Sequence, residues 1–406
     1  MKKKQLSIVI FVTILLLSLV FPASTFEAAE TEVMTANMHE KRVMQLTQYQ
    51  LPEDTLKRFG YDSGLDFEYP DAVRGIYLTG HSAGGSRFET LLNLVDSTEL
   101  NAMVIDIKDD YGYLTYKVDD SSPYADISRN FIKDPRKVLE TLEEKGIYPI
   151  ARIVVFKDTI LAEKRPDLSF TENGNVWANN KGDSFVSPFQ KEVWEYNVGI
   201  AKMAAELGFK EIQFDYVRFP EGFEKRDKEL GYDLGEYKDL ELDDVKKRVE
   251  AVTDFVKYAK EELDFYDVDV SVDIFGYAAT IEETPGIGQN FSKISENVDV
   301  ISSMIYPSHW TSYFGIAVPD MEPYRLVSEY AKVENEVLGK LENKPTSRPW
   351  IQDFEAPWLY SGATKQYGKA EVEAQIRALN EHNINEFLLW NAGNTYTENV
   401  DFTPLN

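Results

Sequence analysis

Asp215 and Asp273 are the two residues whose type and surroundings best suit acid–base chemistry. Asp215 lies near the C-terminal end of an apolar segment, 208–220, and Asp273 lies in a second one, 268–275. A carboxylate in apolar surroundings costs several kcal/mol to desolvate unless it is paired or used. Two carboxyl groups that flank a glycosidic bond can hydrolyse it. Asp215 is therefore our candidate nucleophile or base, and Asp273 our candidate acid/base.

Arginines near these segments could separate the protonation states of the two aspartates. Arg218 follows Asp215 by three residues, and Arg152 lies inside a third apolar segment. Either guanidinium could hold one carboxylate ionised while burial keeps the other protonated. Asp106 is a third candidate carboxylate, although it could instead pair with Lys108 or Arg152.

The rest of the chain alternates regularly between predicted strands and helices, which would position these residues. Apolar, β-branched segments predict strands at 74–78, 102–107, 148–156, 211–217, 268–275, 298–306, 349–354 and 386–390. Helical periodicity predicts helices at 87–95, 137–144, 191–207, 245–263 and 369–380. Such alternation indicates parallel strands with both faces covered. Eight of these units predict a single-domain α/β fold, the (β/α)8 TIM barrel.

Two of the predicted βα loops are unusually long, at 157–190 after strand three and at 221–244 after strand four. Loops of this length in a compact domain are usually functional or disordered. In a barrel both would lie at the C-terminal ends of the strands and could wall a cleft there. An open doubly wound sheet is the structural alternative, but no nucleotide-binding motif accompanies the strands.

Polar and aromatic residues at the strand ends would converge on one rim of the barrel, where active sites of this fold are built. Besides the two aspartates, we expect the cleft to contain Asp106, Lys108, Arg152, Arg218, Tyr306, His309, Trp310, Asp353, Trp390 and Asn391. Sugar rings stack on aromatic side chains, and Asn, Asp and His bond their hydroxyls. Four tryptophans fall at strand ends or in rim loops, and we expect two of them to be platforms: Trp177, Trp310, Trp358 and Trp390.

The sequence predicts neither a cofactor nor a metal ion. Asp109 and Asp110 precede Gly112 and are typical of a turn, although they could contribute to a cation site. No metal-loop spacing is present. The four histidines are too sparse to suggest a zinc centre.

The segment Gly80-His81-Ser82-Ala83-Gly84 matches the G-x-S-x-G pattern of a serine esterase. Three features count against Ser82 as a nucleophile. No convincing strand precedes residue 70, only His309 and His382 are available downstream, and the segment suits the first strand of a barrel. A tight turn after that strand, with glycines that allow close backbone approach, is the alternative interpretation.

Composition limits the partners and the compartment. The formal charge of −26 argues against nucleic acid and anionic lipid as partners. The absence of cysteine excludes disulfides, thiolate metal sites and a lipidated cysteine. Met1-Lys2-Lys3-Lys4 and the apolar run that follows are typical of a secretory signal, which predicts a secreted, extracellular or cell-wall-associated protein. Retention by an uncleaved N-terminal anchor is the alternative.

These patterns divide the chain into a signal peptide at 1–28, an N-terminal spacer or embellishment of the barrel at 29–70, and the barrel at 71–402. The barrel resembles the glycoside-hydrolase-like family known as domain of unknown function 4015. The resemblance rests on segments 74–79, 104–109, 151–158, 211–220, 272–276, 304–310 and 389–392. It implies a barrel related to carbohydrate-active enzymes but carries no catalytic assignment, so the choice of Asp215 and Asp273 rests on position.

The sequence therefore predicts an exported glycosidase that acts on a polysaccharide or cell-wall glycan. The predicted fourth strand faintly resembles that of chitinase-like barrels, which ends with a catalytic Glu. No Glu follows Asp215 at that place here, which argues against their substrate-assisted hydrolysis. A non-catalytic glycan-binding barrel is the first alternative, and a serine esterase through Ser82 is the second.

Overall fold

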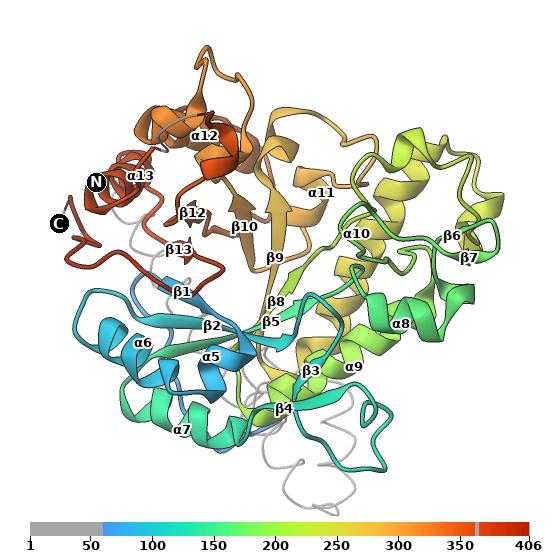
Figure 1. The fold of residues 1–406 in the computed structure, drawn as a ribbon, viewed down its shortest axis with the longest axis horizontal. Helices are drawn as coiled ribbons and strands as arrows, with labels where there is room; N and C mark the ends of the chain where they lie inside the picture. Colours follow the sequence, from blue (N-terminus) through green and yellow to red (C-terminus); the bar gives the residue numbers. More distant parts are fainter. Residues whose placement is uncertain (1–59, 362–364, 406) are drawn as a thin grey trace, which may run out of the picture. The chain divides into compact units, whose positions relative to one another are not determined.

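The computed structural model describes residues 60–361 and 365–405. Eight parallel strands close into a barrel, because the first strand pairs with both the second and the last (Figure 1). In barrel order the strands are β1 (Arg74–Leu78), β2 (Ala102–Lys108), β5 (Tyr148–Val154), β8 (Glu211–Asp215), β9 (Asp269–Phe275), β10 (Val300–Met304), β12 (Trp350–Gln352) and β13 (Phe387–Trp390). The predicted (β/α)8 barrel is confirmed.

Helices lie between successive strands and cover the outside of the barrel (Figure 1). The longer ones are α6 (Arg87–Asp96), α7 (Pro135–Glu144), α9 (Lys191–Leu207), α10 (Asp244–Leu263), α12 (Pro323–Leu338) and α13 (Lys369–Asn380). Of these, α12 was not predicted. The short helices are α5 (Gly80–Gly84), α8 (Thr159–Lys164) and α11 (Phe291–Ser295). No helix within 60–361 or 365–405 combines the length and apolarity that a membrane span requires.

Short strands extend the barrel or decorate its loops. β3 (Leu114–Tyr116) and β4 (Ser128–Ile132) continue the sheet beyond β2, and β11 (Thr346–Ser347) pairs with β10. β6 (Thr171–Glu172) and β7 (Asn175–Val176) form a separate hairpin in the long loop after β5. The sequence did not predict them: four of the five have only two or three residues, and the fifth, β4, carries the polar residues Arg129 and Asn130 in place of an apolar run.

Backbone conformation at two positions sets where β8 begins and ends. Gly208 ends α9 with φ 114°, a left-handed conformation that glycine adopts without steric cost, and the chain then enters β8. Tyr216 has φ 53° and ends β8 directly after Asp215. The observed strand is therefore shorter than the predicted 211–217, and Asp215 is its last residue.

The G-x-S-x-G segment forms the short helix α5 rather than the predicted tight turn. The hydroxyl of Thr79 caps this helix by accepting from the N–H of Ser82. A side chain at Gly84 would meet the carbonyl oxygen of Phe131 at 1.9 Å, so the glycine allows the close backbone approach that was expected.

Residues 61–70, which the sequence places in the spacer, form one compact unit with the barrel. Leu65 is buried in the core, and the Tyr69 hydroxyl bonds Arg348 and Glu386 at the N-terminal ends of the strands. The predicted signal peptide and residues 29–59 lie outside the described residues.

Candidate active site

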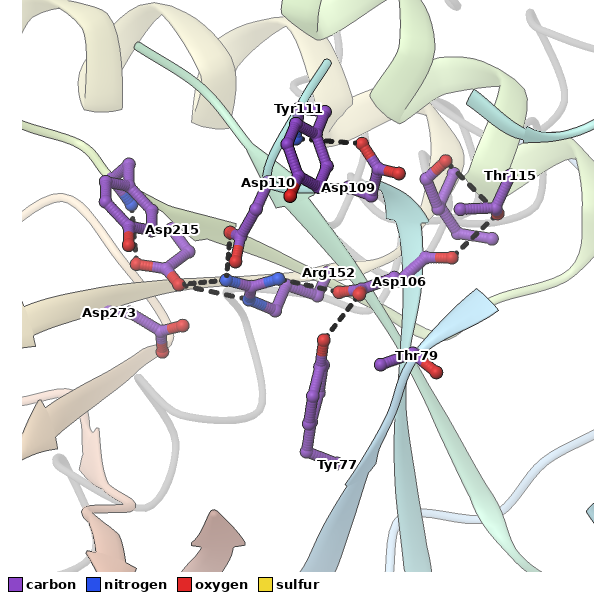
Figure 2. A network of polar contacts seen from close by, with 12 residues as sticks. Tyr77, Thr79, Asp106, Asp109, Asp110, Tyr111, Thr115, Arg152, Asp215 and Asp273 are labelled. Atoms are coloured by element: carbon purple, nitrogen blue, oxygen red, sulfur yellow. Dashed lines mark hydrogen bonds and ion pairs between the residues drawn. The ribbon is translucent and has the colours of Figure 1, made fainter. Parts of the chain in front are cut away.

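Asp215 and Asp273 occupy equivalent positions at the C-terminal ends of neighbouring strands. The register pairs Phe214 on β8 with Val272 on β9, so the next residue along each strand is one of the two aspartates. Neighbouring strands lie about 4.8 Å apart. Both side chains point into the same space (Figure 2) and both are buried, with exposed fractions of 6% and 2%.

The carboxylate of Asp215 is held by a guanidinium and a backbone amide. Its Oδ2 accepts from Arg152 Nε at 3.0 Å and from Nη2 at 2.6 Å, and its Oδ1 accepts from the N–H of Tyr216 at 2.5 Å. The left-handed conformation of Tyr216 is costly for a residue other than glycine. This pairing places a guanidinium directly against the Asp215 carboxylate.

Asp273 has different surroundings, although it lies beside Asp215. Its Oδ1 accepts from the indole N–H of Trp350, which reaches across the barrel from β12, at 2.7 Å. No ion pair to Asp273 forms among the described residues. Burial, reinforced by the charge of Asp215, raises the pKa of Asp273 well above its usual value, despite the opposing effect of Arg152. The carboxyl group therefore favours the protonated form.

Arg152 is the centre of this network and joins carboxylates from three segments (Figure 2). Besides Asp215 it binds Asp106 at 2.7 Å through Nη1 and Asp110 at 3.1 Å through Nη2. The Tyr77 hydroxyl donates to Asp106 at 2.5 Å. Burial raises the pKa of Asp106 to about 7, although Arg152 opposes this shift.

The two residues expected in a turn have different roles. Asp109 accepts from three backbone N–H groups, those of residues 111 to 113, as a turn residue does. Asp110 instead points to Arg152. Burial disfavours its charge, but Arg152 and Lys157 outweigh burial and lower the pKa of Asp110.

Aromatic side chains line the barrel mouth beside the carboxylates. Tyr77 and Trp390 stack with ring centroids 4.2 Å apart, and the Arg152 guanidinium lies 5.4 Å from both rings. From Trp390 the series continues outward through neighbouring rings to Trp358, whose exposed fraction is 63%. Its members are Tyr77, Trp390, Tyr306, Phe354, His309 and Trp358, and we call them the aromatic wall.

On the β5 and β8 side a cavity of about 310 Å³ opens beside Asp215. The long loop after β5 supplies most of its lining, as predicted, whereas loop 221–244 contributes Glu221. Its lining residues are Lys157, Trp177, Asn179, Asn180, Lys181, Asp183, Phe185, Tyr216, Arg218, Pro220 and Glu221. Of the two arginines proposed as partners of a carboxylate, Arg152 pairs with Asp215, whereas Arg218 lines this cavity.

Four residues expected in the cleft have other partners. Lys108 is fully buried behind β2, where its ammonium group contacts Asp158 at 2.6 Å and the Asn197 side chain at 2.9 Å. Trp310 packs against aromatic side chains of the β10–α12 region, including Tyr330. These contacts direct both side chains away from Arg152.

Asp353 and Asn391 hold the C-terminal segment in place. The Asp353 carboxylate accepts from the N–H and the hydroxyl of Thr397, and burial raises its pKa. The Asn391 amide donates to the carbonyl oxygens of residues 353 and 395. Strand-end position alone does not separate such structural residues from those that face the cleft.

Four contributors to the site were not predicted from the sequence: Trp350, Tyr77, Tyr216 and Asp110. Trp350 and Tyr77 are inward-facing residues of β12 and β1, so alternation within the strands could have found them. The left-handed backbone of Tyr216 and the reach of Asp110 to Arg152 have no signal in the sequence.

Neither a serine triad nor a metal cluster is present among the described residues. The only hydroxyl partners of His309 and His382 there are Ser308 and Ser328, and neither histidine bonds Ser82. Within 60–361 and 365–405, no three His, Asp or Glu side chains are grouped to hold a metal ion.

A family model described as "putative glycosyl hydrolase domain", domain of unknown function 4015, matches residues 75–396. The chain belongs to this family. The family resemblance drawn from the sequence is therefore confirmed. No curated protein matches the chain in sequence.

Solved structures place the fold among glycoside hydrolase barrels. The PgaB (BpsB) glycoside hydrolase domain from Bordetella bronchiseptica aligns with a TM-score of 0.54 at 14% identity, over 79% of this chain and 94% of that one. A hypothetical protein from Ruminiclostridium thermocellum is 35% identical over 49% of this chain and 96% of its own, with a TM-score of 0.42. Family and fold are thus those of a glycosyl-hydrolase-like domain.

Proposed function

We propose that the protein is a glycoside hydrolase that acts on a polysaccharide or cell-wall glycan through Asp215 and Asp273. The observation that carries this proposal is the difference between two carboxyl groups on adjacent strands. Arg152 pairs with Asp215 and favours its charge, whereas burial favours the proton on Asp273. Glycoside hydrolysis needs one ionised and one protonated carboxyl group beside the scissile bond.

In this mechanism Asp273 donates its proton to the glycosidic oxygen as the bond to the leaving sugar breaks. Asp215 either attacks the anomeric carbon or removes a proton from the attacking water. The anomer first released, observed by NMR, distinguishes these two roles because only the covalent route retains configuration. The aromatic wall gives the sugar rings a stacking surface that leads toward the carboxylates.

Release of reducing ends from bacterial exopolysaccharides and peptidoglycan tests the proposal, with wild type compared with Asp215→Asn. Wild type is expected to release reducing ends, and the variant to lose this activity while it still binds the glycan. Asp269→Asn is the matched control, because Asp269 lies at the opposite end of β9 and bonds Tyr148 there. Equal activity of wild type and Asp215→Asn would overturn the assignment.

A non-catalytic glycan-binding barrel is the second candidate, and one observation favours it. Arg152 binds three carboxylates, an arrangement that also suits a purely structural ion cluster. Binding of a glycan without reducing-end release by wild type would select this function over hydrolysis. The (β/α)8 fold removes the structural context that a serine esterase through Ser82 requires.

We also propose that the protein is exported and acts outside the cell. The charged start and apolar run at residues 1–20 support this location. Cell fractionation and N-terminal sequencing of the mature protein test it. A start near residue 29 in the medium or wall fraction is expected, and an intact Met1 in the membrane fraction would instead indicate an anchor.

A further inference from the structure

The cavity beside Asp215 differs from the rest of this acidic chain in its charge. Of the five charged residues that line it, three are cationic: Lys157, Lys181 and Arg218. The chain as a whole carries 69 acidic and 43 basic residues. Such a local excess of cations in a concave, partly desolvated site attracts anions.

The loop that builds this cavity folds back on the barrel, so its cations are held in place. Lys157 lies three residues after the end of β5 and forms a β-bridge with Phe185, and the N–H of Asp158 donates to the carbonyl oxygen of Ser184. Arg218 is 5% exposed, and its guanidinium is stacked near the rings of Tyr216 and Phe275. Positioned cations of this kind are suited to specific recognition of a ligand.

The acids that face these cations leave Lys157 and Lys181 available to a ligand. Arg218 is used by Glu221 at 3.2 Å and by a backbone carbonyl. Lys157 lies 3.5 Å from Asp183, too far for a strong bond, and Asp183 also accepts from Asn179. Asp110 also faces Lys157, but Arg152 binds it. Lys181 is exposed and forms no ion pair among the described residues.

The cavity also offers the groups that a sugar ring requires. Trp177 gives it a half-buried aromatic face, and Asn180 gives it an amide beside Lys181. Tyr216 joins the cavity to the carboxylate of Asp215, whose Oδ1 its N–H bonds. A sugar bound in this cavity would therefore adjoin the sugar at the reacting bond.

We propose that this cavity is a subsite for an anionic sugar, whose carboxylate or phosphate group binds Lys157 and Lys181 while its ring packs on Trp177. The inference rests on the proposed function in taking the ligand to be a glycan. It adds the substrate class, an acidic polysaccharide, and assigns the long loop after β5 to substrate selection.

Calorimetric binding in the Asp215→Asn background tests the subsite without turnover. The probes are an oligouronide, its neutral methyl ester and a sugar-phosphate oligomer. At least one anionic probe is expected to bind about tenfold or more tightly than the neutral ester, with an affinity that falls as salt is added. Tighter binding of the oligouronide or of the sugar-phosphate oligomer identifies the charged group as a carboxylate or a phosphate, respectively. Equal or tighter binding of the neutral ester would overturn the proposal.

Three lysine variants locate the effect. Lys157→Met and Lys181→Met are each expected to weaken the anionic probe about tenfold and to leave the neutral ester unchanged. Lys181 is exposed, so this variant keeps the test valid if Lys157→Met does not fold. Lys340→Met is the matched control, because Lys340 is an exposed lysine that follows α12 and pairs with Glu336 at the surface. An equal loss with Lys340→Met would show a general charge effect and contradict the subsite.

The outcome separates this inference from the proposed function. If neutral glycans are cleaved and anionic probes do not bind, the hydrolase stands and the anionic subsite fails. If the oligouronide binds through the lysines but no glycan is cleaved, the subsite stands and the hydrolase fails.

Discussion

Arg348 at the N-terminal end of the barrel and Arg152 at its C-terminal end are both almost completely buried, and both bind carboxylates. Arg348 pairs with Glu211 at 2.7 Å and Glu386 at 2.8 Å, and its remaining Nη2 bonds the Tyr69 hydroxyl at 2.8 Å. Tyr69 in turn donates to Glu386 at 3.0 Å. The floor cluster, Arg348 with Glu211, Glu386 and Tyr69, is therefore complete, with every part of the guanidinium in use.

The rim cluster, Arg152 with Asp106, Asp110, Asp215 and Asp273, contains more carboxyl groups than its arginine can pair. Asp273 forms no bond to Arg152, and the pKa of Asp106 is raised to about 7. Both clusters place carboxyl groups around an almost completely buried arginine. An excess of carboxyl groups over guanidinium therefore distinguishes a site suited to proton transfer from an ion-pair cluster that holds the barrel together.

The largest expected effect is the loss of the floor cation. Arg348→Met leaves two buried carboxylates without a counter-charge, so the free energy of unfolding should fall by about 3–5 kcal/mol. Urea denaturation measures this change. Arg165→Met is the matched control, because Arg165 also binds two carboxylates, Asp167 and Glu192, but at the surface where ion pairs contribute little. Equal losses in both variants would contradict the structural role of the floor cluster.

Replacement of one carboxyl group by an amide should lower activity in the rim cluster and stability in the floor cluster. Asp273→Asn is expected to lower kcat about 10²–10⁴-fold, the usual contribution of a general acid, without loss of stability. Its amide oxygen can still accept from Trp350, and the amide is uncharged like the protonated carboxyl group that it replaces. Glu386→Gln on the floor, which weakens the pair with Arg348, is expected to lower stability and leave kcat unchanged. Assays of hydrolysis and denaturation on both variants measure the contrast, and full activity of Asp273→Asn would refute it.

The raised pKa of Asp106 predicts a pH dependence of stability. Between its ordinary pKa of 3.8 and about 7, the folded protein holds a proton that the unfolded chain releases. This contribution is fully present below about pH 3.8 and is lost as the pH rises through about 7. Asp106→Asn should therefore gain stability relative to wild type as the pH is raised from 4 to 7, which denaturation at several pH values measures.

Asp110 provides the opposite sign within the same cluster. Its pKa is lowered in the folded protein, so its contribution is present above the ordinary pKa and is lost as the pH falls through the lowered one. Asp110→Asn should lose stability relative to wild type near neutral pH and approach it in acid. If stability relative to wild type changed with pH in the same direction in both variants, the pKa values of Asp106 and Asp110 would not be shifted in opposite directions.

The smallest expected effects come from two tyrosine hydroxyls, one in contact with each cluster. Tyr69→Phe removes the bonds to Arg348 and Glu386 and should lower the free energy of unfolding by about 1–2 kcal/mol without change in the pH–activity profile. Tyr77→Phe removes the donor to Asp106 and should shift that profile as well. Denaturation and activity, each measured across pH, distinguish these effects. A shifted pH–activity profile in Tyr69→Phe would contradict a purely structural role of the floor cluster.

Much of the fold could be predicted because its signals are local. All eight barrel strands and five of the six long helices were expected within a few residues, since burial on both faces of a parallel strand leaves an apolar run. The helix α12 was missed because Glu334 and Ser328 interrupt its buried face. Residues 61–70 were assigned to a spacer because their bonds, such as that of Tyr69 to Arg348, join positions far apart in the chain.

The site was predictable in part. Strand-end position identified Asp215, Asp273, Asp106 and Arg152, because parallel strands bring their carboxyl ends to one rim. It also selected Lys108, whose side chain points to the helix layer, where Asp158 and Asn197 bind it. Trp350 lies 77 residues after Asp273 in the chain, so no local sequence pattern links the two residues.

The sequence by itself determined the alternation of strands and helices, the eightfold count and the rim on which the acids meet, because periodicity and burial are properties of short segments. Only the tertiary structure decided that Arg152 rather than Arg218 pairs with Asp215, that Trp350 bonds Asp273, and that three cations meet in one cavity. A pKa and an ion pair depend on distances of a few ångströms between side chains from different strands, and closure of the barrel is what sets those distances.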